Sequence, residues 1–141
     1  MKNVFFSVLM TLVFTGMMSC ASSNKLSVQQ LDGKWNITEV NGKEVTQKEK
    51  VPFIEFNLTE NRVHGNAGCN MFNSSIVRDS KDLSAFKLSQ AASTMMACPN
   101  MELEGEIMKT FESITGLKQG SSEKEVLLVN GEGKTLLVLS K

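Results

Sequence analysis

The sequence predicts one small β-rich domain that carries a single helix, a domain of the α+β class. Across most of the 141 residues, short runs of alternating apolar and polar residues are separated by turn residues, a pattern typical of antiparallel strands. Residues 101–115 instead repeat apolar side chains at helical spacing, which predicts one amphipathic helix. The chain ends in two apolar runs joined by Asn130-Gly131-Glu132-Gly133, which predicts a hairpin. The length favours a single domain.

Residues 1–19 are expected to be a signal peptide that is cleaved from the chain. Lys2 provides a positive start, residues 4–14 are almost continuously apolar, and the segment ends at Ser19. The apolar run is shorter than the roughly 20 residues that a transmembrane helix needs. A buried N-terminal helix is the alternative, but polar residues follow immediately. We expect residues 20–30 to form a flexible tether and residues 31–141 to form the domain.

The end of this segment, Ser19-Cys20, resembles the lipobox of bacterial lipoproteins, in which a small residue precedes the cysteine that becomes lipidated. The resemblance implies acyl chains on Cys20, which would anchor the protein in a membrane. Several chains give stable anchoring because each buried methylene contributes about 0.8 kcal/mol. No acidic run follows Cys20, and we expect attachment to the outer membrane, facing the periplasm. Ordinary secretion with an unmodified Cys20 is the alternative.

Two cysteines, Cys69 and Cys98, remain once Cys20 carries lipid. In an exported chain they are expected to form a disulfide, which closes a loop of about 30 residues and contributes roughly 3.5 kcal/mol. Free thiols and a soft-metal site are the alternatives, since thiolate and thioether ligands suit Cu(I). Four methionines lie near the cysteines in the sequence, at Met71, Met95, Met96 and Met101. Methionine is, however, also a good core filler.

The first half of the domain is expected to consist of short strands. They lie at residues 35–38, 52–58, 62–65 and 83–88, with further apolar pairs at 71–72 and 76–77. Asn41-Gly42 is a strong turn signal after the first strand. Residues 65–70 are too rich in glycine for a plain strand, so they predict a bulge or tight bend where backbone passes close to backbone. Residues 92–98 form a small, apolar run that Pro99 ends.

The helix is expected to begin after Asn100, which suits an N-cap, and to stop at Gly116. Its apolar face consists of Leu103, Ile107, Phe111 and Ile114, with Met108 beside them. Several glutamates occupy its first turns, where the helix dipole favours negative charge. The terminal hairpin pairs residues 125–129 with 135–139. Both arms are nearly continuously apolar, which predicts strands covered on both faces.

From Leu31 to the C-terminus the chain resembles the META domain family, which includes heat-inducible lipoproteins of the HslJ type. Three segments carry the resemblance: Leu31-Asp32-Gly33-Lys34-Trp35, residues 62–72 with Gly68-Cys69-Asn70, and Thr94-Met95-Met96-Ala97-Cys98. The family implies an antiparallel sheet curled into an open, cracked barrel with a helix packed across it. A similar architecture occurs in a lipoprotein pilot that binds lipid in its cleft. Family members are linked to heat response, antibiotic tolerance and virulence, and fold alone does not fix function.

The sequence excludes some function classes and leaves others open. The 15 basic residues are balanced by 15 acidic ones, so the chain has no excess of positive charge to bind the phosphate backbone of a nucleic acid. The only histidine, His64, has no nucleophile or paired carboxylates near it in the sequence, so we expect no enzyme and no cofactor. Asn66, Ala67 and Asn70 could line a binding face, but we expect instead that Gly65, Gly68 and Asn70 serve the backbone of a sharp bend.

We therefore expect a monomeric, non-enzymatic envelope lipoprotein. Its domain would bind a protein partner or a lipid-like ligand, with no ligand-binding residue identified. A lipoprotein that binds or senses copper through Cys69, Cys98, His64 and the nearby methionines is the alternative.

Overall fold

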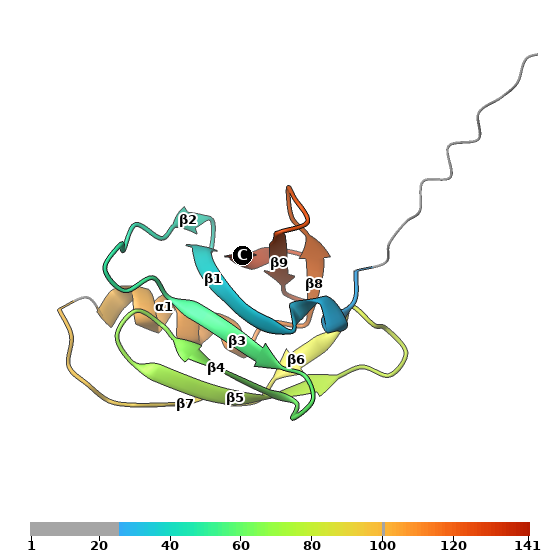
Figure 1. The fold of residues 1–141 in the computed structure, drawn as a ribbon, viewed down its shortest axis with the longest axis horizontal. Helices are drawn as coiled ribbons and strands as arrows, with labels where there is room; N and C mark the ends of the chain where they lie inside the picture. Colours follow the sequence, from blue (N-terminus) through green and yellow to red (C-terminus); the bar gives the residue numbers. More distant parts are fainter. Residues whose placement is uncertain (1–25, 100) are drawn as a thin grey trace, which may run out of the picture.

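A single antiparallel sheet curls almost fully around on itself in the computed structural model, which describes residues 26–99 and 101–141 (Figure 1). The elements in chain order are η1 (Val28–Leu31), β1 (Gly33–Val40), β2 (Lys43–Glu44), β3 (Phe53–Asn57), β4 (Arg62–Asn66), β5 (Met71–Arg78), β6 (Phe86–Leu88), β7 (Ala92–Ser93), α1 (Met101–Phe111), β8 (Gly116–Gln119), β9 (Glu125–Val129) and β10 (Thr135–Ser140). The expected signal peptide and Cys20 lie outside the described residues, as does Asn100.

The strand order is β6-β5-β4-β3-β1-β10-β9-β8, and two short strands lie off this path. One is β2, which pairs with β1, and the other is β7, which pairs with β5. All of these pairings are antiparallel. The predicted class, a curled antiparallel sheet with one helix, is confirmed.

The two ends of the sheet meet between β6 and β8, which nearly closes the barrel. Ala85 and Gly116 form an antiparallel bridge, and the Phe86 amide donates to the Thr115 carbonyl at 3.1 Å. A Cβ at Gly116 would lie 3.0 Å from the Ser84 carbonyl oxygen, so a larger residue would push the two ends apart. The expectation that Gly116 ends the helix is wrong: α1 ends at Phe111, and Gly116 begins β8.

The core fills the inside of the barrel and extends onto α1. Ile54 and Phe56 point inward from β3, as the alternation predicted. On the helix, Ile107 and Phe111 are fully buried, and the Phe111 ring packs edge-on against Phe72 of β5, with centroids 4.8 Å apart. Leu103 and Met108 pack at the margin of the core. The predicted apolar face of the helix therefore faces the sheet.

Other expectations are confirmed or modified strand by strand. The terminal hairpin forms as β9 and β10, and four successive residues of β10 are buried, so this strand is covered on both faces. β5 runs without interruption through the polar residues 73–75. Strand β8 was not predicted. Val28 of η1 is buried in the core, so packed structure begins before Leu31.

Close backbone approach explains one glycine of the predicted bend. A Cβ at Gly65 in β4 would collide with the Phe53 carbonyl of β3 and lie 2.8 Å from the Phe72 ring. Three strands are thus packed around a position that has no room for a side chain. None of the helices in the described part of the chain has the length and apolar character required to cross a bilayer.

Candidate functional site

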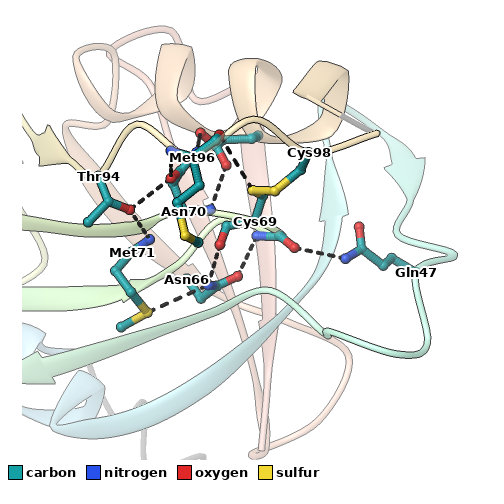
Figure 2. The surroundings of a disulfide bond; sticks show 10 residues. Gln47, Asn66, Cys69, Asn70, Met71, Thr94, Met96 and Cys98 are labelled. Atoms are coloured by element: carbon teal, nitrogen blue, oxygen red, sulfur yellow. Dashed lines mark hydrogen bonds between the residues drawn. A yellow bond between two sulfur atoms is a disulfide. The ribbon is translucent and has the colours of Figure 1, made fainter.

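The two cysteine-containing segments meet at one end of the barrel, beside the start of α1 (Figure 2). Cys69 follows β4 in the bend, and Cys98 lies in the extended stretch between β7 and the helix. The predicted disulfide between them is present, with Cα atoms 6.2 Å apart. Cys69 is buried and Cys98 half-buried. The bond fastens a surface segment to the barrel.

Asn70 is the centre of a hydrogen-bond network beside the disulfide, and only 1% of it is exposed. Its side-chain amide donates to the Glu104 carboxylate at 2.9 Å and to the Met96 carbonyl at 3.1 Å. Its side-chain oxygen accepts from the Thr94 hydroxyl at 2.8 Å and the Met96 amide at 2.7 Å. Both ends of the side chain are therefore satisfied, as a buried amide requires.

Glu104 receives a second hydrogen bond, from the backbone amide of Asn70 at 2.8 Å. Its carboxylate is buried in the first turn of α1, where the helix dipole favours negative charge. Sequence reasoning placed this residue only among the acidic residues of the first turns. A signal was available, since Glu104 stands three residues before Ile107 and seven before Phe111, on the same helix face.

The bend before Cys69 is shaped by its own polar groups. The Asn66 side-chain oxygen accepts from the Gly68 amide at 2.8 Å, and its amide donates to the Cys69 carbonyl at 3.1 Å. Gly68 has a φ of +114°, which L side chains rarely adopt. The Ala67 amide donates to the Asn70 carbonyl at 3.0 Å. Gly68 therefore serves the backbone of the bend, as the sequence suggested. The side chain of Asn70 instead bonds residues outside the bend.

An open groove of about 850 Å³ lies between residues 43–50, the disulfide and the first turns of α1. Val40, Val45 and Leu103 give it apolar lining, and the disulfide forms part of its wall. Gln47 donates to the Gly68 carbonyl at 2.9 Å, so the loop that borders the groove is tied to the bend. The groove thus adjoins both cysteine-containing segments.

Charged side chains of both signs surround the groove. Residues 43–50 contribute three lysines and two glutamates, and α1 contributes Glu102 and Glu106. The Lys43 ammonium lies 3.1 Å from a carboxylate oxygen of Glu106. This hydrogen bond and the negative charge of Glu106 raise the pKa of Lys43 above its ordinary value of 10.5. The pair links β2 to the helix along one side of the groove.

His64 lies on the exposed face of β4. Its side chain is half exposed, 3.5 Å from a carboxylate oxygen of Glu55 on the neighbouring strand. Both cysteine sulfurs are joined to each other, and the Cys69 sulfur lies 3.8 Å from the Met96 carbonyl oxygen. Within residues 26–99 and 101–141, no three or more His, Cys, Asp or Glu side chains form a cluster that could hold a metal ion.

The sequence model that describes the META domain family matches residues 26–141 of the chain. The chain belongs to the META domain family. Among solved structures, this META domain is similar to a protein from Burkholderia xenovorans solved by NMR (TM-score 0.59, 20% identity, 79% of this chain and 83% of that one). It is also similar to a DUF4847 family protein from Bacteroides vulgatus ATCC 8482 (TM-score 0.53, 14% identity, 78% and 92%). These likenesses concern the fold. No curated protein matches the chain.

In this META domain, two of the three segments that carried the family resemblance come together around the disulfide and Asn70. One segment, Gly68-Cys69-Asn70, contains the bend, one cysteine and the buried amide. In the other segment, Thr94 and Met96 form hydrogen bonds with Asn70, and Cys98 forms the disulfide with Cys69. Glu104 of α1 completes the network. The network fixes one wall of the groove, which has an apolar lining in part and charged side chains around it.

Proposed function

We propose that this META domain is anchored at the bacterial envelope through acyl chains on Cys20 and acts by binding, without catalysing a reaction. The observation that carries the proposal is the groove between residues 43–50, the disulfide and α1. Ligand sites in proteins are typically concave and largely apolar, with a few fixed polar groups. The ligand is a protein segment or a lipid-like molecule with an apolar part that covers Val45 and Leu103.

The position of the groove relative to the N-terminus supports a ligand on the periplasmic side. η1 lies near β6 at one end of the long axis, whereas the first turns of α1 lie towards the other end (Figure 1). The residues between Cys20 and Leu26 span at most about 20 Å, since an extended chain advances 3.3–3.6 Å per residue. A lipid on Cys20 would thus hold the η1 end near the membrane and leave the groove directed away from it.

The anchor is tested by phase separation in Triton X-114 and by labelling with a palmitate analogue. The wild-type chain is expected to carry the label and enter the detergent phase, since several acyl chains give stable partitioning. Cys20→Ala is expected to lose the label. An unlabelled wild-type protein that stays in the aqueous phase contradicts the anchor.

The role of the groove is tested in a deletion strain, which we expect to be more sensitive to heat, detergent and hydrophobic antibiotics. Wild-type protein should restore resistance. Leu103→Arg places a charge in the groove lining and should fail to restore it, whereas Glu112→Arg, at an exposed position, serves as the matched control. Wild-type resistance of the deletion strain under all three stresses contradicts a role in envelope integrity.

Copper binding is the second candidate, because four exposed methionines, at positions 71, 95, 96 and 101, belong to or flank the segments joined by the disulfide. Thioether ligands suit Cu(I), but in the oxidised protein both cysteine sulfurs are occupied. Intact-mass measurement without reductant separates the candidates. A mass two protons below that of the dithiol supports the disulfide, and retained metal with free thiols supports copper.

A further inference from the structure

The segment that links β6 to α1 differs in composition from the rest of the surface. No charged residue occurs from Leu88 to Met101, although 21% of the chain is charged. Residues 92–97 are nonetheless all exposed, and Met95 reaches 97%. Such a stretch is neither core nor an ordinary solvated surface.

This segment forms an open edge of the sheet. β7 pairs only with β5, with Ser93 opposite Phe72, and the Thr94 amide then donates to the Met71 carbonyl at 3.0 Å. Alternate residues of an antiparallel strand direct their backbone groups to opposite sides. The backbone groups of Ser93 and Met95 therefore point away from β5. Within the described residues the backbone of Met95 makes no hydrogen bond.

The edge is held in its extended shape before any partner arrives. Asn70 binds both Thr94 and the backbone of Met96, and Cys98 is joined to Cys69. Preorganisation of this kind removes much of the entropy cost of binding. A flexible loop with the same composition would lack that advantage.

The other short edge strand, β2, is protected in the way natural sheets protect their edges. Both of its residues, Lys43 and Glu44, are charged, and residues 48–50 add three further charges. Charged side chains on an edge discourage pairing with another strand. The edge at β7 lacks this protection, because residues 92–98 include no charged residue and no proline.

We propose that residues 92–96 are a docking edge, onto which an extended, uncharged segment of a partner protein adds as a further strand beside β7. Main-chain hydrogen bonds to Ser93 and Met95 supply affinity, as in other cases of strand addition. Exposed Met71, Met95 and Met96 supply adaptable apolar contacts. The proposal rests on the proposed function only in that the domain acts by binding; it requires neither the groove nor the anchor.

Site-specific photo-crosslinking in intact cells that naturally express the full chain tests this edge. A benzophenone amino acid at Ser93 should give a protein adduct, whereas the same group at Glu44, on the protected edge, should not. Mass spectrometry of the adduct should place the crosslinks on an extended partner segment, at every second residue. In this background, Met95→Pro removes one outward amide and should lower adduct yield about tenfold, the effect of one or two hydrogen bonds. Met95→Ala keeps the amide and should lower it less.

Several results would overturn the proposal. Equal adduct yields at Ser93 and Glu44 would do so. Crosslinks to lipid, to a second copy of this chain or to a helix of the partner would also contradict it. So would an adduct yield that Met95→Pro leaves unchanged while the variant keeps its disulfide and its circular dichroism spectrum. Failure of the proposed function appears elsewhere, as loss of the palmitate label or as an inactive groove variant that retains the Ser93 adduct.

Discussion

The terminal hairpin and the segment around Cys98 are both fixed parts of one domain, but they are fixed by opposite means. In β10, residues 136–139 are all buried, and the hairpin lies inside the sheet, with β1 beside β10 and β8 beside β9. Residues 92–97 are all exposed. They are held by hydrogen bonds to β5 and the buried Asn70, and by one disulfide.

This contrast separates what maintains the fold from what shapes the surface at the site. Burial of apolar area is additive and tolerant of side-chain identity. A buried polar network depends on particular donors and acceptors, because each unpaired member costs more than a lost contact on the surface. Changes in the hairpin should therefore lower global stability, and changes at Asn70 should chiefly release the surface segment.

The largest effect is expected for Leu137→Ala in β10. Leu137 is fully buried, and removing such a side chain leaves a cavity and costs about 4 kcal/mol of unfolding free energy. Urea denaturation followed by circular dichroism measures this loss. Lys134→Ala, at an exposed position in the hairpin loop, is the control and should change stability by less than about 0.5 kcal/mol. Equal losses of unfolding free energy in the two variants would contradict the idea that burial of apolar side chains in the hairpin stabilises the fold.

Removal of the disulfide should have the next largest effect. The double variant Cys69→Ser and Cys98→Ser is expected to lose roughly 3.5 kcal/mol, because the unfolded chain regains the freedom of a loop of about 30 residues. The folded variant should keep a protected hairpin in amide hydrogen exchange, while residues 94–98 exchange faster. Uniformly faster exchange over β9 and β10 would show that the two regions are not separable.

Asn70→Ala should cost about 2–3 kcal/mol, because four side-chain hydrogen bonds disappear and the Glu104 carboxylate keeps only the backbone donor. We expect faster hydrogen exchange at residues 94–96 even with the disulfide intact. Asn73→Ala, exposed on β5, is the matched control. If Asn70→Ala and Asn73→Ala exchange alike at these residues, the network is not what holds the segment.

The smallest effect is expected for Lys43→Met beside the groove. The pKa of Lys43 is raised in the folded protein, first by its hydrogen bond to Glu106 and then by the charge of that carboxylate. The stability from this pair is therefore fully present below the ordinary pKa of 10.5 and is lost as pH rises through the higher folded pKa. Wild type and Lys43→Met should differ slightly at pH 8 and converge at strongly alkaline pH. A difference that grows with pH would have the wrong sign.

Regular patterns in the sequence predicted most of the elements. The alternation at Ile54 and Phe56, the turn at Asn41-Gly42 and the helix face around Ile107 and Phe111 are all found in the structure. Strand β8 was not predicted because a glycine after an amphipathic run commonly ends a helix. The reason for Gly116 is visible only in the structure, where the Ser84 carbonyl oxygen leaves little room for a side chain. The role of Glu104 escaped because its partner, Asn70, is 34 residues away in the chain.

The sequence by itself determined the class of the fold, its helix and hairpin and the family, because these follow from local periodicity and motifs. Only the tertiary structure decided where the barrel closes, which glutamate is buried and which strand edge stays open. These features arise from contacts between residues far apart in the chain. The hydrogen bond of a buried amide or the missing neighbour of an edge strand leaves no periodic mark in the order of the amino acids.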